Sequence, residues 1–257
     1  MRNVFKKSFY KIAKPSVNEF IYKNKNTLFP RNSIFFSEGF AFCVFSKMYS
    51  CDVIIESGVR YGGSTRMILN YFDNDVTIHS NDLLIQHKED VENTIENISL
   101  EYPSRSWSFH PGKGEEVVYD LAKSYQGTGK RIAIMIDGPK YKSAVDLSRV
   151  CLQLDEVKFV SIHDMGQIPY KRLRGREERN SIEDIRGMDN HIFNTDALWY
   201  RKKFADRIDD EICGANPSKD WGIWRKKYLH GCGLSFLINP KNEKIFASNS
   251  ENIFYSK

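Results

Sequence analysis

The stretch CDVIIESGVRYGGST (residues 51–65) decides the fold. It opens with a continuous β-branched run (53–55), which is typical of a strand buried on both faces of a parallel sheet. Three glycines follow, and Ser64 and Thr65 are residue types that favour helix N-caps. The stretch therefore predicts a buried strand, a tight glycine turn that a ligand can approach closely, and a helix over residues 64–71.

Strand and helix patterns keep alternating on both sides of this stretch. Apolar or β-branched runs predict further strands at residues 76–82, 106–110, 131–138 and 158–164. The intervening segments predict helices at residues 37–50, 88–101, 115–125 and 143–154. Such alternation predicts a doubly wound α/β sheet, in which ligands bind at the carboxyl ends of the strands.

The alternation stops after the fifth predicted strand. Residues 165–230 are a long polar insertion with 14 Lys or Arg and 11 Asp or Glu, placed either as a substrate lid or as a surface elaboration. Two apolar runs, GLSFLI (233–238) and KIFAS (244–248), predict a closing C-terminal β-hairpin. We therefore expect four parts: a basic N-terminal arm (1–30), an α/β core (31–164), the insertion (165–230), and the hairpin with its tail (231–257).

The net charge of +5 is concentrated in the N-terminal arm. Residues 1–30 hold seven Lys or Arg and one acidic residue, Glu19, so they carry +6 and the rest of the chain sums to −1. The body therefore does not call for a nucleic-acid partner, while the arm could touch a membrane surface, a partner or the acidic body itself. Phe5, Phe9 and Ile12 have helical spacing up to Pro15, where we expect that helix to end.

Localisation is predicted from what the sequence lacks. No apolar run approaches the ~18 residues needed to span a bilayer, and the basic N-terminus has no continuous apolar segment of the kind found in signal peptides. The five cysteines are an odd number and show no zinc-ligand spacing. These features predict a cytoplasmic protein with reduced thiols and no transmembrane segment.

The glycine turn and the later strand ends share a family pattern. ESGVRYGGST (56–65) matches E-x-G-x-x-x-G-x-S-T, and it is followed in order by HSND (79–82), FHPG (109–112), IDGPKY (136–141) and SIHDMG (161–166). In this the sequence resembles the class I S-adenosylmethionine-dependent methyltransferases, and within them the small-molecule and sugar O-methyltransferase branch. The resemblance covers about residues 37–164 and implies a Rossmann-like methyltransferase sheet with a long insertion after the fifth strand.

The resemblance also implies a cofactor site for S-adenosylmethionine. Its implied residues lie in the glycine turn and at the next two strand ends: Glu56, Gly58, Gly62, Gly63, Ser64, Thr65, Asp82 and Gly112. In the family, the first acid or its neighbours handle the methionine amine, and the acid ending the second strand takes the ribose hydroxyls. From the residues alone, Glu56 could instead hold the loop by hydrogen bonds, and Asp82 could be a turn-forming residue.

The fourth and fifth strand ends carry the candidate catalytic residues Asp137, Lys140 and His163. In metal-dependent members of the family, carboxylates at these strand ends bind a divalent ion, usually Mg²⁺, which would make Asp137 and Asp164 metal ligands. Two carboxylates and an imidazole suit Mg²⁺ less well than three oxygens, so Asp137 or His163 could instead be a general base. Lys140 replaces the family's histidine, and it could act as a base or bind an anionic group. Lys113 replaces an acid that often contacts adenine in the family, which puts that contact in doubt.

Together these features predict an S-adenosylmethionine-dependent methyltransferase that acts on an oxygen of a small-molecule acceptor, such as a sugar or glycan precursor. Methyl transfer from a sulfonium needs alignment and removal of one proton, so few catalytic residues are required. Two alternatives stay open: an RNA or protein methyltransferase recruited by the basic arm, and a non-catalytic binding module on the same fold. A nucleic-acid partner is not favoured, and homo-oligomerisation is compatible with either class.

Overall fold

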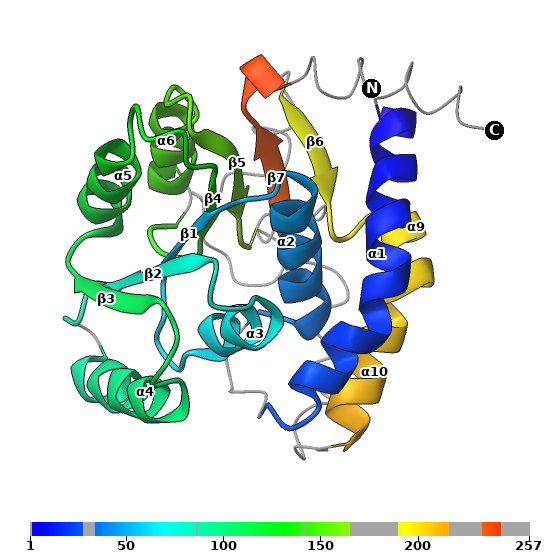
Figure 1. The fold of residues 1–257 in the computed structure, drawn as a ribbon, viewed down its shortest axis with the longest axis horizontal. Helices are drawn as coiled ribbons and strands as arrows, with labels where there is room; N and C mark the ends of the chain where they lie inside the picture. Colours follow the sequence, from blue (N-terminus) through cyan, green and yellow to red (C-terminus); the bar gives the residue numbers. More distant parts are fainter. Residues whose placement is uncertain are drawn as a thin grey trace, which may run out of the picture.

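The computed structural model describes residues 2–27, 34–85, 87–140, 142–164, 190–215 and 233–242 (Figure 1). Its centre is a single sheet made of β1 (Val53–Ser57), β2 (Thr77–Asp82), β3 (Trp107–Pro111), β4 (Ile132–Ile136), β5 (Val157–Ile162), β6 (His191–Asn194) and β7 (Ser235–Ile238). The strand order is β3-β2-β1-β4-β5-β7-β6. The first five strands are parallel, and β7 runs antiparallel to both β5 and β6.

Helices cover both faces of this sheet. The longer ones are α1 (Arg2–Asn24), α2 (Phe36–Met48), α3 (Gly63–Tyr71), α4 (Lys88–Glu101), α5 (Gly114–Ser124), α6 (Lys142–Cys151) and α10 (Asp206–Ala215). Shorter pieces are α9 (Leu198–Tyr200), η1 (Arg201–Ala205) and η2 (Pro240–Asn242). Helices α5 and α6 lie on one face, and α1, α2 and α3 lie on the other (Figure 1). The predicted doubly wound, Rossmann-like α/β sheet is therefore confirmed.

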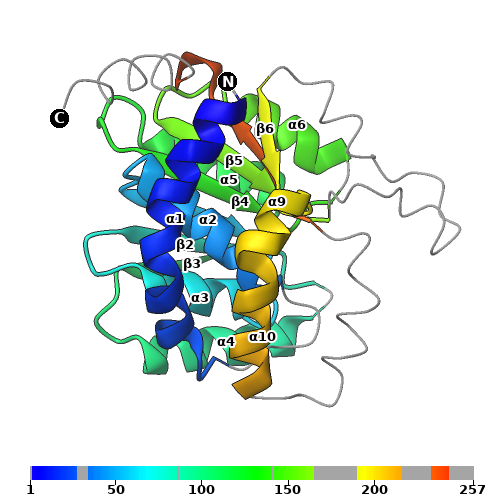
Figure 2. The same ribbon diagram turned by 90° about the vertical axis from the view of Figure 1, so that its right-hand side faces the viewer.

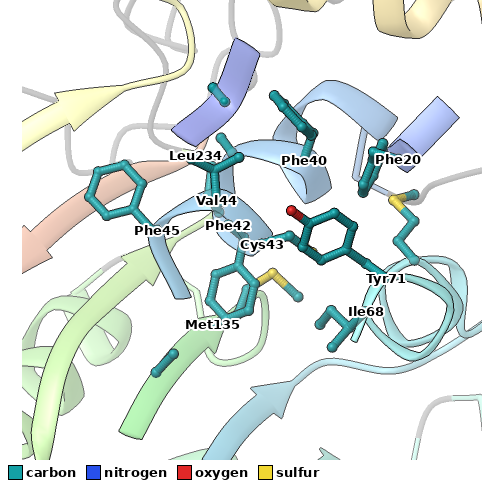
Figure 3. Close-up of a cluster of buried hydrophobic side chains, with 14 of the residues drawn as sticks. Phe20, Phe40, Phe42, Cys43, Val44, Phe45, Ile68, Tyr71, Met135 and Leu234 are labelled. Carbon is teal, nitrogen blue, oxygen red and sulfur yellow. The ribbon is translucent and has the colours of Figure 1, made fainter. Parts of the chain in front are cut away.

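The continuous apolar runs of the strands follow from this two-sided cover. In β4, Ala133 and Met135 pack in the cluster that holds α1, α2 and α3, whereas Ile132, Ile134 and Ile136 pack in the cluster under α5 and α6. All five side chains are fully buried. Figure 3 shows Met135 beside Phe42 of α2 in the first cluster. Because both faces of this strand contact apolar layers, none of its side chains faces solvent. Its sequence is therefore one continuous apolar run, without the alternation of apolar and polar residues.

The N-terminal residues form α1, which packs along α2 and α10 (Figure 2). Phe5, Phe9 and Phe20 are buried in the main apolar cluster. The expected helix end at Pro15 is wrong, because the helix runs on to Asn24. Pro15 lies on the exposed side of α1, and we attribute its tolerance to this position and to the buried residues that anchor the helix on both sides of it.

Residues 190–215 of the predicted insertion belong to the body. They supply β6, at one edge of the sheet, and α10, whose Asp209 accepts hydrogen bonds from the backbone N–H and hydroxyl of Ser37 on α2 (2.8 and 2.7 Å). The remainder of the insertion, including its Trp-rich part, lies outside the described residues. Of the predicted C-terminal hairpin, the first arm is β7 and residues 244–248 lie outside the described residues. Within the described ranges, no helix has the length and apolar character needed to cross a membrane.

Candidate functional site

Most of the predicted site residues lie at the carboxyl ends of β1, β2, β4 and β5, and Gly112 follows β3. Strand β1 lies between β2 and β4, at the point where the strand order changes direction. The loops after these strands are tied to one another by the backbone. The Gly58 N–H donates to the Asn81 carbonyl (2.8 Å), and the Asp137 N–H donates to the Ser57 carbonyl (2.8 Å). In open α/β sheets this is the crevice where ligands bind.

The turn after β1 needs its glycines for conformation and for close packing. Gly58 has φ of +99°, and a Cβ on it would lie 2.9 Å from the Gly138 nitrogen. Gly62 has φ of +70° and stands at the N-cap of α3. The expected capping by Ser64 and Thr65 is wrong, because α3 begins at Gly63 and both residues lie inside its first turn. The N-cap residue, a glycine, makes no side-chain hydrogen bond to this helix end, and the residues of its first turn are buried. A ligand that reached this turn would meet backbone N–H groups.

Glu56 is the buried anchor of this turn. Its carboxylate accepts hydrogen bonds from the hydroxyls of Thr65 (2.6 Å), Ser80 (3.1 Å) and Ser64. Burial raises the pKa of Glu56 to about 7, although the three hydroxyl bonds oppose the rise; the charge of Asp137 adds to it. These contacts fit the alternative in which Glu56 holds the loop by hydrogen bonds, since they fasten α3 and β2 to the end of β1.

Asp82 holds the glycine turn from the neighbouring strand. One carboxylate oxygen accepts from the Arg60 N–H (2.9 Å) and the other from the Leu83 N–H (2.7 Å). The side chain is only half-buried, and each oxygen keeps a lone pair beyond the one it uses. Asp82 therefore both shapes the turn and offers acceptor capacity at the crevice.

Asn81 is a site residue that the sequence pattern did not identify. Its side-chain amide donates to the carbonyls of His110 (2.8 Å) and Gly112 (3.0 Å), and its oxygen accepts from the Ser57 hydroxyl (3.0 Å). It thereby joins the ends of β1, β2 and β3. Gly112 has φ of +139°, where a side chain would be strained. For Asn81, the available signal in the sequence was its position directly before Asp82 at the end of a strand.

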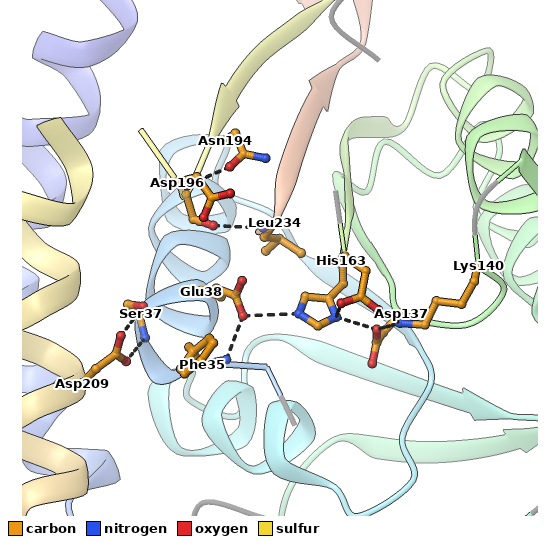
Figure 4. A network of polar contacts seen from close by, with 12 residues as sticks. Phe35, Ser37, Glu38, Asp137, Lys140, His163, Asn194, Asp196, Asp209 and Leu234 are labelled. Atoms are coloured by element: carbon orange, nitrogen blue, oxygen red, sulfur yellow. Dashed lines mark hydrogen bonds and ion pairs between the residues drawn. The ribbon is translucent and has the colours of Figure 1, made fainter. Parts of the chain in front are cut away.

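A second group of charged residues gathers at the ends of β4 and β5, and we call it the Lys140 cluster: Glu38, Asp137, Lys140, His163 and Asp164. Figure 4 labels all of these except Asp164. The Lys140 ammonium contacts Asp137 and lies 2.9 Å from Asp164 Oδ2. The His163 Nδ1 lies 2.7 Å from Asp137 Oδ1, and its Nε2 lies 3.4 Å from Glu38 Oε2. Asp137, His163 and Asp164 thus converge as predicted, and Lys140 lies between the two aspartates.

Glu38 joins this cluster from α2, although no sequence motif marks it. It is buried, and its carboxylate also accepts from the Phe35 N–H (2.8 Å) at the start of α2. The only signal in the sequence is one acidic residue in the first turn of a mostly apolar helix. Its position 125 residues before His163 gives no local pattern.

Opposite charges set the protonation states in the Lys140 cluster. Burial alone would raise the pKa of Asp137, but the charges of Lys140 and His163 outweigh burial and hold it well below its usual range. Burial would lower the pKa of His163, but Asp137, Asp164 and Glu38 raise it well above its usual range. A raised pKa favours the protonated form of His163, which holds and donates a proton better than it accepts one as a general base.

Comparisons with known proteins find likeness in structure and not in sequence. No family model matches the chain, and no curated protein matches it. A solved structure of an assumed O-methyltransferase from Klebsiella pneumoniae aligns at 15% identity over 87% of this chain and 90% of that one, with a TM-score of 0.46. The O-methyltransferase TomG from Streptomyces achromogenes, solved with S-adenosylmethionine, aligns at 10% identity over 87% and 89%, with a TM-score of 0.44. An O-methyltransferase from Bacillus cereus aligns at 11% identity over 87% and 90%, with a TM-score of 0.41. At such low identities and TM-scores, these likenesses assign no activity.

Proposed function

We propose that the protein is an S-adenosylmethionine-dependent methyltransferase that acts on a hydroxyl oxygen of a small polar or sugar-like acceptor. One observation carries the proposal. A glycine turn, the half-buried carboxylate of Asp82 and the Lys140 cluster all meet at one carboxyl edge of the sheet, where the strand order changes direction. This edge combines a place for a nucleoside with charged groups for an acceptor.

The cofactor side fits S-adenosylmethionine by chemistry. The uncapped first turn of α3 offers backbone N–H groups, which suit the methionine carboxylate. The free lone pairs of Asp82 suit a ribose diol, and a carboxylate nearby favours the positively charged sulfonium. When bound, the cofactor supplies an electrophilic methyl group. Glu56 would act without touching the cofactor, because its contacts with the Ser64 and Thr65 hydroxyls hold the first turn of α3 in place.

The acceptor side follows from the Lys140 cluster. Methyl transfer forms an oxygen–carbon bond, breaks the carbon–sulfur bond of the sulfonium, and releases the hydroxyl proton. The ammonium of Lys140 would stabilise negative charge that develops on the acceptor oxygen. The carboxylate of Asp164, which is the more exposed of the two aspartates at the lysine, would accept the hydroxyl's hydrogen bond and its proton. It would be a weak base, because the effect of burial is outweighed by the charges of His163 and Lys140, which lower its pKa. His163 would keep Asp137 in place.

Calorimetric titration with S-adenosylmethionine and S-adenosylhomocysteine tests the proposal. We expect saturable binding of both, and a 10- to 100-fold weaker affinity in Asp82→Ala, because a charge-assisted hydrogen bond contributes about 1.5–3 kcal/mol. Asp75→Ala is the matched control, since Asp75 is an exposed aspartate at the opposite end of β2, just before the strand begins. Absence of binding to the folded wild-type protein would overturn the proposal. Cofactor binding without methylation of any hydroxylated acceptor would favour the binding-module alternative.

A further inference from the structure

The Lys140 cluster contains a set of atoms that resembles a metal site. One donor atom each from Asp137, His163 and Asp164 lies within 4.8 Å of the other two. Two carboxylates and an imidazole around one point are a donor set that divalent ions accept. The sequence resemblance also implies an ion at these strand ends. Whether the residues present fit an ion is therefore decided by what else contacts these three side chains.

Lys140 occupies the place between the two carboxylates. Its ammonium contacts Asp137 and lies 2.9 Å from Asp164 Oδ2, so both aspartates already have a cationic partner. A divalent ion between the same oxygens would stand within a few ångströms of the ammonium, and the two positive charges would repel each other. An ion could enter only if Lys140 swung out and left both of its partners.

The imidazole of His163 is partly committed. Its Nδ1 makes a 2.7 Å hydrogen bond with Asp137 Oδ1, so this nitrogen and this carboxylate oxygen already hold each other. Its buried Nε2 makes no hydrogen bond within the described residues, and Glu38 Oε2 lies 3.4 Å from it (Figure 4). What opposes an ion is therefore the Lys140 ammonium together with the bond at Nδ1.

The charge balance leads to the same conclusion. The two aspartate carboxylates together carry −2, and the Lys140 ammonium between them offsets one of these charges. Without that ammonium the same two carboxylates would present −2, which a divalent ion would neutralise. The geometry points to Lys140 as the built-in cation of this site, and we infer that this chain uses its ammonium where a divalent ion would otherwise bind. The role of that ammonium toward an acceptor rests on the proposed function; the exclusion of the ion does not.

Binding of Mn²⁺, followed by electron paramagnetic resonance and by calorimetry, tests the inference without any activity assay. We compare the wild-type protein with Lys140→Met, which keeps the length of the stem and removes the charge. The matched control is Lys142→Met, because Lys142 is highly exposed and pairs with Asp146 outside the cluster. We expect the wild type and Lys142→Met to bind Mn²⁺ only weakly, with dissociation constants on the order of millimolar or above. We expect Lys140→Met to bind it at least 10-fold more tightly, and Asp164→Asn in the Lys140→Met background to lose that gain.

Two results would overturn the inference. One is stoichiometric, sub-millimolar Mn²⁺ binding by the wild type that Asp164→Asn abolishes, and it can be obtained even if Lys140→Met does not fold. The other is a folded Lys140→Met protein that binds Mn²⁺ no better than the wild type, because the lysine would then not be standing in for an ion. A gain of Mn²⁺ binding in a protein that fails to bind S-adenosylmethionine would uphold the inference and reject only the proposed function.

Discussion

Two carboxylates on neighbouring strands of this sheet meet opposite surroundings. Glu56, on β1, faces three neutral hydroxyls, whereas Asp137, just after β4, faces the cations Lys140 and His163. Burial penalises the charged form of both. It raises the pKa of Glu56 to about 7, while for Asp137 the cations outweigh burial and lower the pKa. Asp137 is also the less buried of the two, with 23% of its side chain exposed, so cationic partners and a shallower position both favour its charged form.

This difference in partners gives the two carboxylates different tasks at the same edge of the sheet. Hydroxyl partners fasten the glycine turn while leaving little net charge near a ligand. Cationic partners keep the second group of acids ionised and fixed in position. We therefore infer that the Glu56 side of the crevice fixes the conformation of the glycine turn, and that the Lys140 cluster holds charged groups in position.

Removing the Glu56 carboxylate should have the largest effect on stability. Glu56→Ala leaves the hydroxyls of Ser64, Thr65 and Ser80 buried without their acceptor, and opens a cavity. We expect a loss of about 3–5 kcal/mol in the free energy of unfolding, measured by urea denaturation. The control is Glu96→Ala, at an exposed position on α4, which should change stability by less than about 0.5 kcal/mol. A loss of that small size in Glu56→Ala would show that the hydroxyls find other partners.

The raised pKa of Glu56 should make stability fall as the pH rises. The folded protein holds this proton more tightly than the unfolded chain, so the stabilisation is complete below about pH 4.5 and is lost as the pH passes about 7. The shift corresponds to about 3 kcal/mol. We expect the stability difference between wild type and Glu56→Gln to fall by that amount between these limits, measured by denaturation at a series of pH values. A pH-independent difference would mean that Glu56 titrates normally.

Removing the Lys140 charge should have a smaller effect, because this side chain is partly exposed. Lys140→Met leaves Asp137 and Asp164 without their shared cation, and we expect a loss of about 1–3 kcal/mol at neutral pH. Lys142→Met should lose less than about 0.5 kcal/mol. Thermal denaturation in 1 M salt should narrow the gap between the two variants, since screening weakens partly exposed pairs. Equal stability of the two variants at low salt would show that the Lys140 charge does not hold the two aspartates in place, and would contradict the role given to the Lys140 cluster.

The sequence predicted the sheet and the convergence at its edge because both depend on local patterns. Alternating strands and helices place the ends of parallel strands together, and this brought Asp137, His163 and Asp164 to one place. Glu38 was missed because it arrives from α2 through packing and leaves no mark near the motif. The capping role expected of Ser64 and Thr65 was wrong because the buried Glu56 carboxylate takes both hydroxyls. Such long-range contacts depend on the finished fold.

A crystal structure determined after soaking with S-adenosylmethionine and Mn²⁺, with anomalous data collected at the manganese edge, tests this division of the crevice most directly. We predict cofactor density along residues 57–63 and beside Asp82, no manganese peak between Asp137 and Asp164, and Lys140 still joined to both aspartates. An empty glycine turn would contradict the assignment of the cofactor side. A manganese ion ligated by the two aspartates, with Lys140 displaced, would contradict the assignment of the charged side.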